Sequence, residues 1–144
     1  MTRGIPSEVV QHFKSVPLFS EVSAKGLRAL VSAATEIDVK PGKVLVREGG
    51  FDSDLFVILR GSAEVSRGDK RLRTLGEGDF FGEMALLHKA PRSATVTATS
   101  QMTVMVLGWR ELEGILQDEP ALMRPILSAL AERVRANDPR SATH

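Results

Sequence analysis

The chain of 144 residues is 42% hydrophobic, which suits one globular domain with a sizeable core. Its formal net charge of +1 excludes the clear basic excess of a dedicated nucleic-acid surface, and the lack of cysteine excludes disulfides, thiolate metal sites and a cysteine nucleophile. The three histidines are scattered, so we expect no metal site. No apolar run approaches the roughly 20 residues that span a bilayer, and the first residues lack the apolar core of a signal peptide, so we expect a cytoplasmic protein.

Two short helices are predicted near the N-terminus. Ser7 can cap a helix over residues 8–14, which Pro17 then ends. Ser23 can cap a second helix, in which apolar residues recur at helical spacing at Leu27, Leu30 and Val31. The apolar segment between these helices, Val16-Pro17-Leu18-Phe19, is expected to pack onto the core.

From Thr35 the pattern changes to short alternating runs separated by glycine turns. Residues 55–59 are apolar at every position, which predicts a central strand buried on both faces. Arg67-Gly68-Asp69-Lys70 is typical of a hairpin tip. Strands this short, recurring at about ten residues, indicate a sandwich or barrel.

Helical spacing returns at Trp109, with an apolar stripe at Leu112, Ile115 and Leu116. Asp118 can cap a further helix with Pro120 in its first turn. The apolar positions of that helix are Leu122, Ile126, Leu127, Leu130 and Val134. Pro125 lies inside it and is expected to kink its axis.

One stretch, residues 81–95, combines groups suited to a small sugar-phosphate ligand. Gly82 permits a backbone conformation that a Cβ would hinder. The short helix predicted from Met84 would present unpaired N–H groups to an anion. Arg92 brings a planar cation suited to bidentate phosphate contact, and the Glu83 carboxylate can accept hydrogen bonds from sugar hydroxyls.

This stretch resembles the phosphate-binding cassette of the cyclic nucleotide-binding domain family. The family pattern, Phe-Gly-Glu-aliphatic-Ala-Leu, a short loop and then Pro-Arg-small-Ala, is matched from Phe81 to Ala94 without a gap in its core. The resemblance covers about residues 16–135. It implies an α+β, mainly β fold: an eight-stranded β-roll or jelly-roll barrel with short N-terminal helices, a phosphate-binding helix, and C-terminal B and C helices.

We therefore expect a single domain over residues 1–144. Its parts are expected to be N-terminal helices over residues 7–33, the β-roll over 35–108, C-terminal helices over 109–136, and a frayed tail over 137–144.

The resemblance also implies which residues bind the ligand. Glu83 would bind the ribose 2′-hydroxyl and Arg92 the cyclic phosphate, and backbone N–H groups near Gly82, Ala85 and Ser93 would complete the phosphate seat. Met84 and Ala94 belong to the same cassette and are counted in the site. In the family the position of Ser93 is often Ala where cAMP is the main ligand and Thr where cGMP binds well, so base choice stays open.

Arg133 has two interpretations. It either stacks on the base, as an arginine near the end of the C helix does in some bacterial family members, or it is a solvated charge in the last helical turn, where it suits the helix dipole.

These observations predict a cyclic nucleotide sensor, with cAMP as its leading ligand and cGMP as the close alternative, acting as a regulatory domain in signal transduction. Catalysis is not expected, because a jelly-roll enzyme of the cupin type needs a histidine-rich metal site and the three histidines of this chain are scattered. The alternative is a degenerate form of the fold that serves as a protein-interaction scaffold. We expect no cofactor, no DNA binding, no membrane contact by this chain, a monomer, and an effector domain or partner protein that receives the signal.

Overall fold

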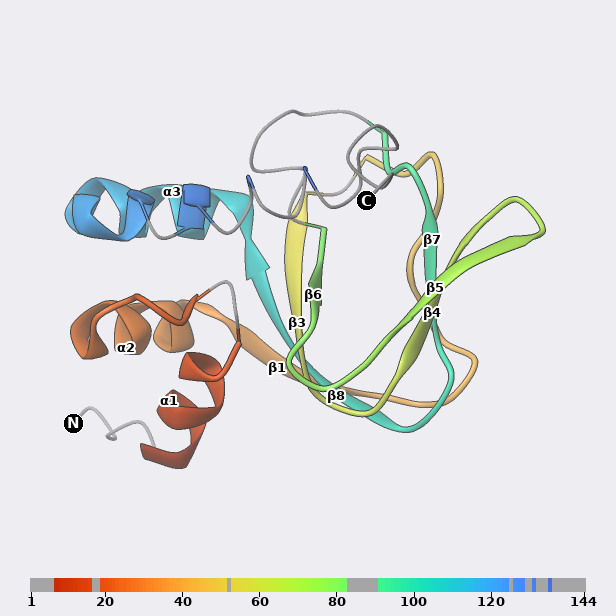
Figure 1. The fold of residues 1–144 in the computed structure, drawn as a ribbon, viewed down its shortest axis with the longest axis horizontal. Helices are drawn as coiled ribbons and strands as arrows, with labels where there is room; N and C mark the ends of the chain where they lie inside the picture. The colour runs from red at the N-terminus through yellow and green to blue at the C-terminus, as the bar shows by residue number, and fades with distance from the viewer. Residues whose placement is uncertain are drawn as a thin grey trace.

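The fold is an eight-stranded β-roll with helices packed at one end, as seen in a computed structural model that describes residues 7–16, 19–51, 53–82, 91–124, 126–128, 131 and 135 (Figure 1). Within these residues the expected mainly β architecture is confirmed. The elements are α1 (Ser7–Lys14), α2 (Ala24–Ala33), β1 (Thr35–Val39), β2 (Val44–Val46), β3 (Asp54–Arg60), β4 (Ala63–Arg67), β5 (Lys70–Leu75), β6 (Phe80–Phe81), β7 (Thr95–Ala98), β8 (Met102–Gly108), α3 (Trp109–Asp118) and a 3₁₀ helix η3 (Pro120–Leu122).

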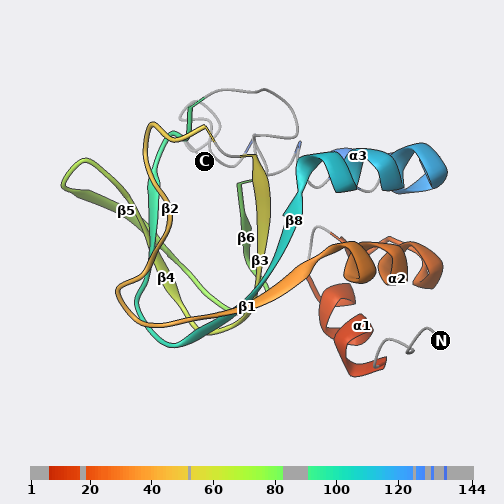
Figure 2. The ribbon, with the colours of Figure 1, turned by 180° about the vertical axis from the view of Figure 1, so that it is seen from behind.

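The strands form two four-stranded antiparallel sheets, with the orders β1-β8-β3-β6 and β2-β7-β4-β5. The first sheet lies next to the helices and the second faces away from them, as the two opposite views show (Figures 1 and 2). No helix among the described residues is long and apolar enough to cross a membrane.

The prediction of a central buried strand is confirmed for β3, which runs between β8 and β6. Its residues alternate between two cores. Leu55, Val57 and Leu59 pack in the core shared with the helices, while Phe56 and Ile58 pack in the core enclosed by the roll. Because apolar residues cover both faces of this strand, the run carries no polar alternation.

Both predicted N-terminal helices form, although α1 includes Ser7, which was expected to precede it as the cap. The Ser23 hydroxyl caps α2 by accepting a hydrogen bond from the N–H of Gly26 at 3.1 Å. Between the helices, Val16 and Phe19 are buried, and the Phe19 ring stacks on Phe13 with ring centroids 5.4 Å apart. The expected packing of the apolar segment onto the core is therefore confirmed for these two residues.

The C-terminal elements pack against the N-terminal helices. Leu112 of α3 and Leu122 of η3 are buried in the same core as α2, and a Cβ on Gly26 would collide with the Leu122 side chain. The prediction that Asp118 caps the next helix is wrong, because α3 continues through Asp118 and Glu119 occupies the cap position before Pro120. Pro125, Leu130 and Val134 lie outside the described residues, as does the expected tail over 137–144.

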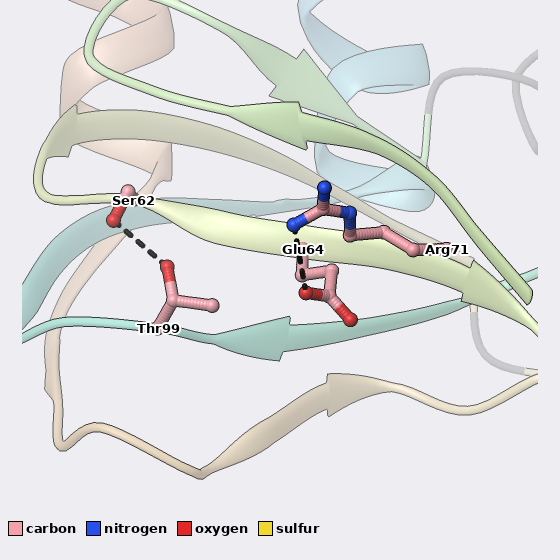
Figure 3. A network of polar contacts seen from close by, with 4 residues as sticks. All are labelled: Ser62, Glu64, Arg71 and Thr99. Atoms are coloured by element: carbon pink, nitrogen blue, oxygen red, sulfur yellow. Dashed lines mark hydrogen bonds and ion pairs between the residues drawn. The ribbon is translucent and has the colours of Figure 1, made fainter. Parts of the chain in front are cut away.

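The predicted hairpin tip is also confirmed, since β4 and β5 are joined by Gly68 and Asp69. Side chains link β4 to both of its neighbours, as Figure 3 shows. Arg71 of β5 lies 3.9 Å from the Glu64 carboxylate, and the Ser62 and Thr99 hydroxyls are 2.8 Å apart. These exposed contacts contribute little energy, but they fit the observed register of the strands.

The two-sided burial of β3 predicts a large destabilisation from truncating one of its side chains. Leu55, 1% exposed, should lose about 2–5 kcal/mol of unfolding free energy when changed to alanine, because a cavity remains. Leu72 on β5, 38% exposed, provides a matched control that should lose less than about 1 kcal/mol. Urea unfolding of Leu55→Ala and Leu72→Ala checks this, and equal losses would contradict the burial pattern.

Candidate functional site

The candidate site begins where β6 ends, at Gly82. Gly82 has φ of +87°, a conformation that side chains disfavour. A Cβ at this position would collide with the Asp54 carbonyl oxygen and would lie 2.9 Å from Nη1 of Arg92. The expectation that a Cβ would hinder this position is therefore confirmed by both backbone conformation and space.

Arg92 connects three segments that are far apart in the sequence. Its Nη1 donates to the carbonyl oxygen of Gly82 at 3.2 Å, and its Nη2 donates to the carbonyl oxygen of Asp54 at 2.7 Å. The guanidinium thus lies between the end of β6 and the start of β3. Arg92 itself belongs to the segment that leads into β7. Because the group is planar and its donors are in a fixed fork, two contacts suffice to set its orientation.

The backbone of Arg92 is held as firmly as its side chain. Its N–H donates to the Gly50 carbonyl at 2.7 Å, and its carbonyl accepts from the Gly49 N–H at 2.8 Å. The turn before β3 and the chain that enters β7 are thereby joined by two short hydrogen bonds. These contacts limit the movement of the backbone that carries the arginine.

The structure describes only some of the residues predicted for the site. It brings Gly82 and Arg92 together, with Ser93 exposed and Ala94 partly buried directly after them. The remaining predicted site residues, Glu83, Met84, Ala85 and Arg133, lie outside the described residues.

Two site residues, Asp54 and Gly50, were missed by the sequence reasoning. Both act through backbone carbonyls, which accept hydrogen bonds from Arg92. Every residue type carries a carbonyl, so nothing in the sequence marks these positions. The resulting arrangement, a fixed guanidinium beside a glycine, is suited to holding an anion such as a phosphate.

Comparison with known proteins identifies relatives of the chain. The family profile described as "Cyclic nucleotide-binding domain" matches residues 36–119, more than half of the chain. A cGMP-dependent protein kinase of Toxoplasma gondii is 40% identical over 102 residues, which are 71% of this chain and 10% of the kinase. A cAMP-dependent protein kinase regulatory subunit of Yarrowia lipolytica is 35% identical over 128 residues, 88% of this chain and 31% of the subunit.

A solved structure agrees with these sequence relatives. The N-terminal domain of a transcriptional regulator from Streptomyces coelicolor A3(2) has 29% sequence identity and a TM-score of 0.74, covering 85% of this chain and 92% of that domain. The chain therefore spans at most about a third of the two kinase relatives' length, but nearly all of this solved domain.

The crowding at Gly82 predicts a stability difference between two glycines with nearly equal φ angles. Gly78, with φ of +88°, has open space where a Cβ would lie, with none of the described atoms within 4 Å, so Gly78→Ala should cost only the conformational strain of about 1–2 kcal/mol. Gly82→Ala should cost that amount plus the collision with Asp54. Thermal unfolding of both variants checks this, and equal destabilisation would contradict the close approach.

Proposed function

The chain belongs to the cyclic nucleotide-binding domain family, and on this premise we propose that it is a sensor that binds cAMP preferentially and passes the signal through its C-terminal helices. The observation that carries the proposal is the orientation of the Arg92 guanidinium, which we name the arginine fork. The Gly82 and Asp54 carbonyls orient it, and Arg92 occupies the motif position whose arginine binds the phosphate in the family.

In this proposal Arg92 binds the cyclic phosphate. A guanidinium whose direction is already set loses little conformational entropy when a phosphate binds, because the side chain has been ordered beforehand. Glu83 would bind the ribose 2′-hydroxyl, and the N–H groups of Gly82, Ala85 and Ser93 would complete the seat. Met84 and Ala94 would lie beside them, and Arg133 would stack on the base.

The preference for cAMP over cGMP is the finer part of the proposal. Ser93 keeps the hydroxyl group found in family members that bind cGMP well, but it lacks the threonine methyl group. The relatives named above include a cGMP-dependent kinase and a subunit of a cAMP-dependent kinase. We propose cAMP as the leading ligand, with cGMP as the close competitor.

We propose that the domain performs no chemistry of its own and acts in the cytoplasm on an effector domain or partner protein. The motif over residues 81–94 accounts for nucleotide binding alone, and in this proposal the nucleotide is released chemically unchanged. A degenerate scaffold that binds no nucleotide is the second candidate. The intact motif residues Glu83 and Arg92 favour the sensor, because a scaffold that binds no nucleotide has no need for the pair.

The proposed relay uses the packing of the C-terminal segment. Leu122 and Ile126 are buried against the core that includes α2, while Met123 and Leu127 are 43% and 46% exposed. Burial of the Leu122 side chain and of the Ile126 side chain contributes about 1.5–3 kcal/mol each, so this energy favours the segment packed against α2. A bound nucleotide would favour a second position of the C-terminal segment, in which the segment covers the base and makes contacts that exist only there.

Removing the fork should weaken nucleotide binding. We expect the parent protein to bind cAMP more tightly than cGMP in calorimetric titration, and Arg92→Ala to lose about 10- to 150-fold in affinity, because a charged hydrogen-bonded contact is worth roughly 1.5–3 kcal/mol. Arg92→Lys should also bind less tightly, since a point charge does not reproduce the fork.

Arg60 serves as the matched control for this measurement. It is exposed at the opposite end of β3 from Asp54, so Arg60→Ala removes the same charge without touching the fork. Its affinity should equal that of the parent. A parent protein that binds neither nucleotide at millimolar concentration would instead support the scaffold.

The relay predicts a change in amide hydrogen exchange when saturating cAMP is added. Protection should rise over residues 82–94 and change over residues 122–134, where the C-terminal segment leaves one position for another. The central strand β3 should exchange equally with and without ligand, because its pairing with β6 and β8 is kept in both states. Unchanged exchange over residues 122–134 would rule out the C-terminal segment as the switch.

A further inference from the structure

The tip of the β4–β5 hairpin contacts the backbone that follows Arg92. Nε of Arg67 donates to the carbonyl oxygen of Ser93 at 2.9 Å. This contact joins residues 26 positions apart in the sequence, and it is made by the last residue of β4. Since the guanidinium belongs to a hairpin with its own strand pairing, the Ser93 carbonyl is held from outside its own segment.

Glu48 anchors the same hairpin tip to the turn before β3. Its carboxylate accepts from the N–H of Gly68 at 2.9 Å, and its own N–H donates to the Thr95 hydroxyl at 2.9 Å. The turn, the hairpin tip and the start of β7 are therefore connected to one another in a closed set of contacts. Gly68 has φ of +59°, a left-handed conformation that glycine adopts readily in a tight turn.

We propose that the hairpin tip is a clamp that positions the phosphate-binding backbone, with Arg67 as a positioning residue; this rests on the proposed function. In a trans peptide the C=O and the following N–H point in opposite directions. The Gly49 N–H holds the Arg92 carbonyl, so it sets the direction of the Ser93 N–H. Arg67 holds the Ser93 carbonyl, so it sets the direction of the Ala94 N–H.

The clamp has a purpose because Ser93 is exposed. An exposed peptide group is free to rotate unless another segment holds it. Rotation of the peptide after Ser93 would be coupled, through the φ and ψ of Ser93, to the peptide before it, which carries the Ser93 N–H proposed to bind the phosphate. Arg67 supplies a charged donor on a side chain long enough to reach across from β4. The clamp therefore acts on the ligand through the backbone, without any contact between Arg67 and the nucleotide.

The test compares Arg67→Met with Arg73→Met by calorimetric titration with cAMP. Methionine keeps an unbranched apolar stem and removes the donors. Arg67→Met should weaken binding about 2- to 10-fold, the equivalent of one hydrogen bond. Arg73 is exposed on the same hairpin and loses the same charge, so Arg73→Met should bind as the parent does. Arg67→Lys, which keeps one donor, should recover part of the affinity.

A double-mutant cycle separates positioning from a general structural role. In an Arg92→Ala background, Arg67→Met should cost less affinity than in the parent, because both changes act on the same phosphate. Equal costs in both backgrounds would overturn the clamp, as would an Arg67→Met variant that binds like the parent or an Arg73→Met variant that loses as much. A parent that binds no nucleotide would overturn the proposed function itself.

Discussion

The guanidinium of Arg92, shared between two backbone carbonyls, sets the geometry at one end of the β-roll. Through it the start of β3, the end of β6 and the chain that enters β7 converge on one side chain. The convergence depends on a glycine, because any Cβ at Gly82 would occupy the space next to the Asp54 carbonyl. The positive charge is thus fixed by backbone atoms, whose positions the surrounding sheets determine.

The strand that begins at Asp54 also connects this end of the roll with the helices. Alternate residues of β3 pack in the core of the roll and in the core shared with α1, α2, α3 and η3. A strand held from both sides has little freedom to shift, so its first carbonyl is a firm support for the arginine. Leu122 and Ile126 pack in the same helical core, and ligand binding can affect them only by changing which contacts they prefer.

Backbone pairing ties the segment around Arg92 and Ser93 to other parts of the chain, although Ser93 is exposed. The turn at Gly49 and Gly50 pairs with both the N–H and the carbonyl of Arg92, and the hairpin tip contacts the next carbonyl. These contacts join segments from three separate parts of the chain. An arrangement built in this way requires the whole roll to be folded, since none of its segments has these partners alone.

Local patterns in the sequence determined the Ser23 cap, the apolar run of β3, the hairpin at Gly68 and the positive φ of Gly82, because each depends on neighbouring residues alone. The cap before Pro120 was placed one residue early, at Asp118 instead of Glu119, because α3 continues through Asp118. Only the tertiary structure decided that Asp54 and Gly50 contact Arg92 and that Arg67 contacts Ser93. Backbone carbonyls have no sequence signature, and a contact between residues 26 or 38 positions apart exists only once the sheets bring them together.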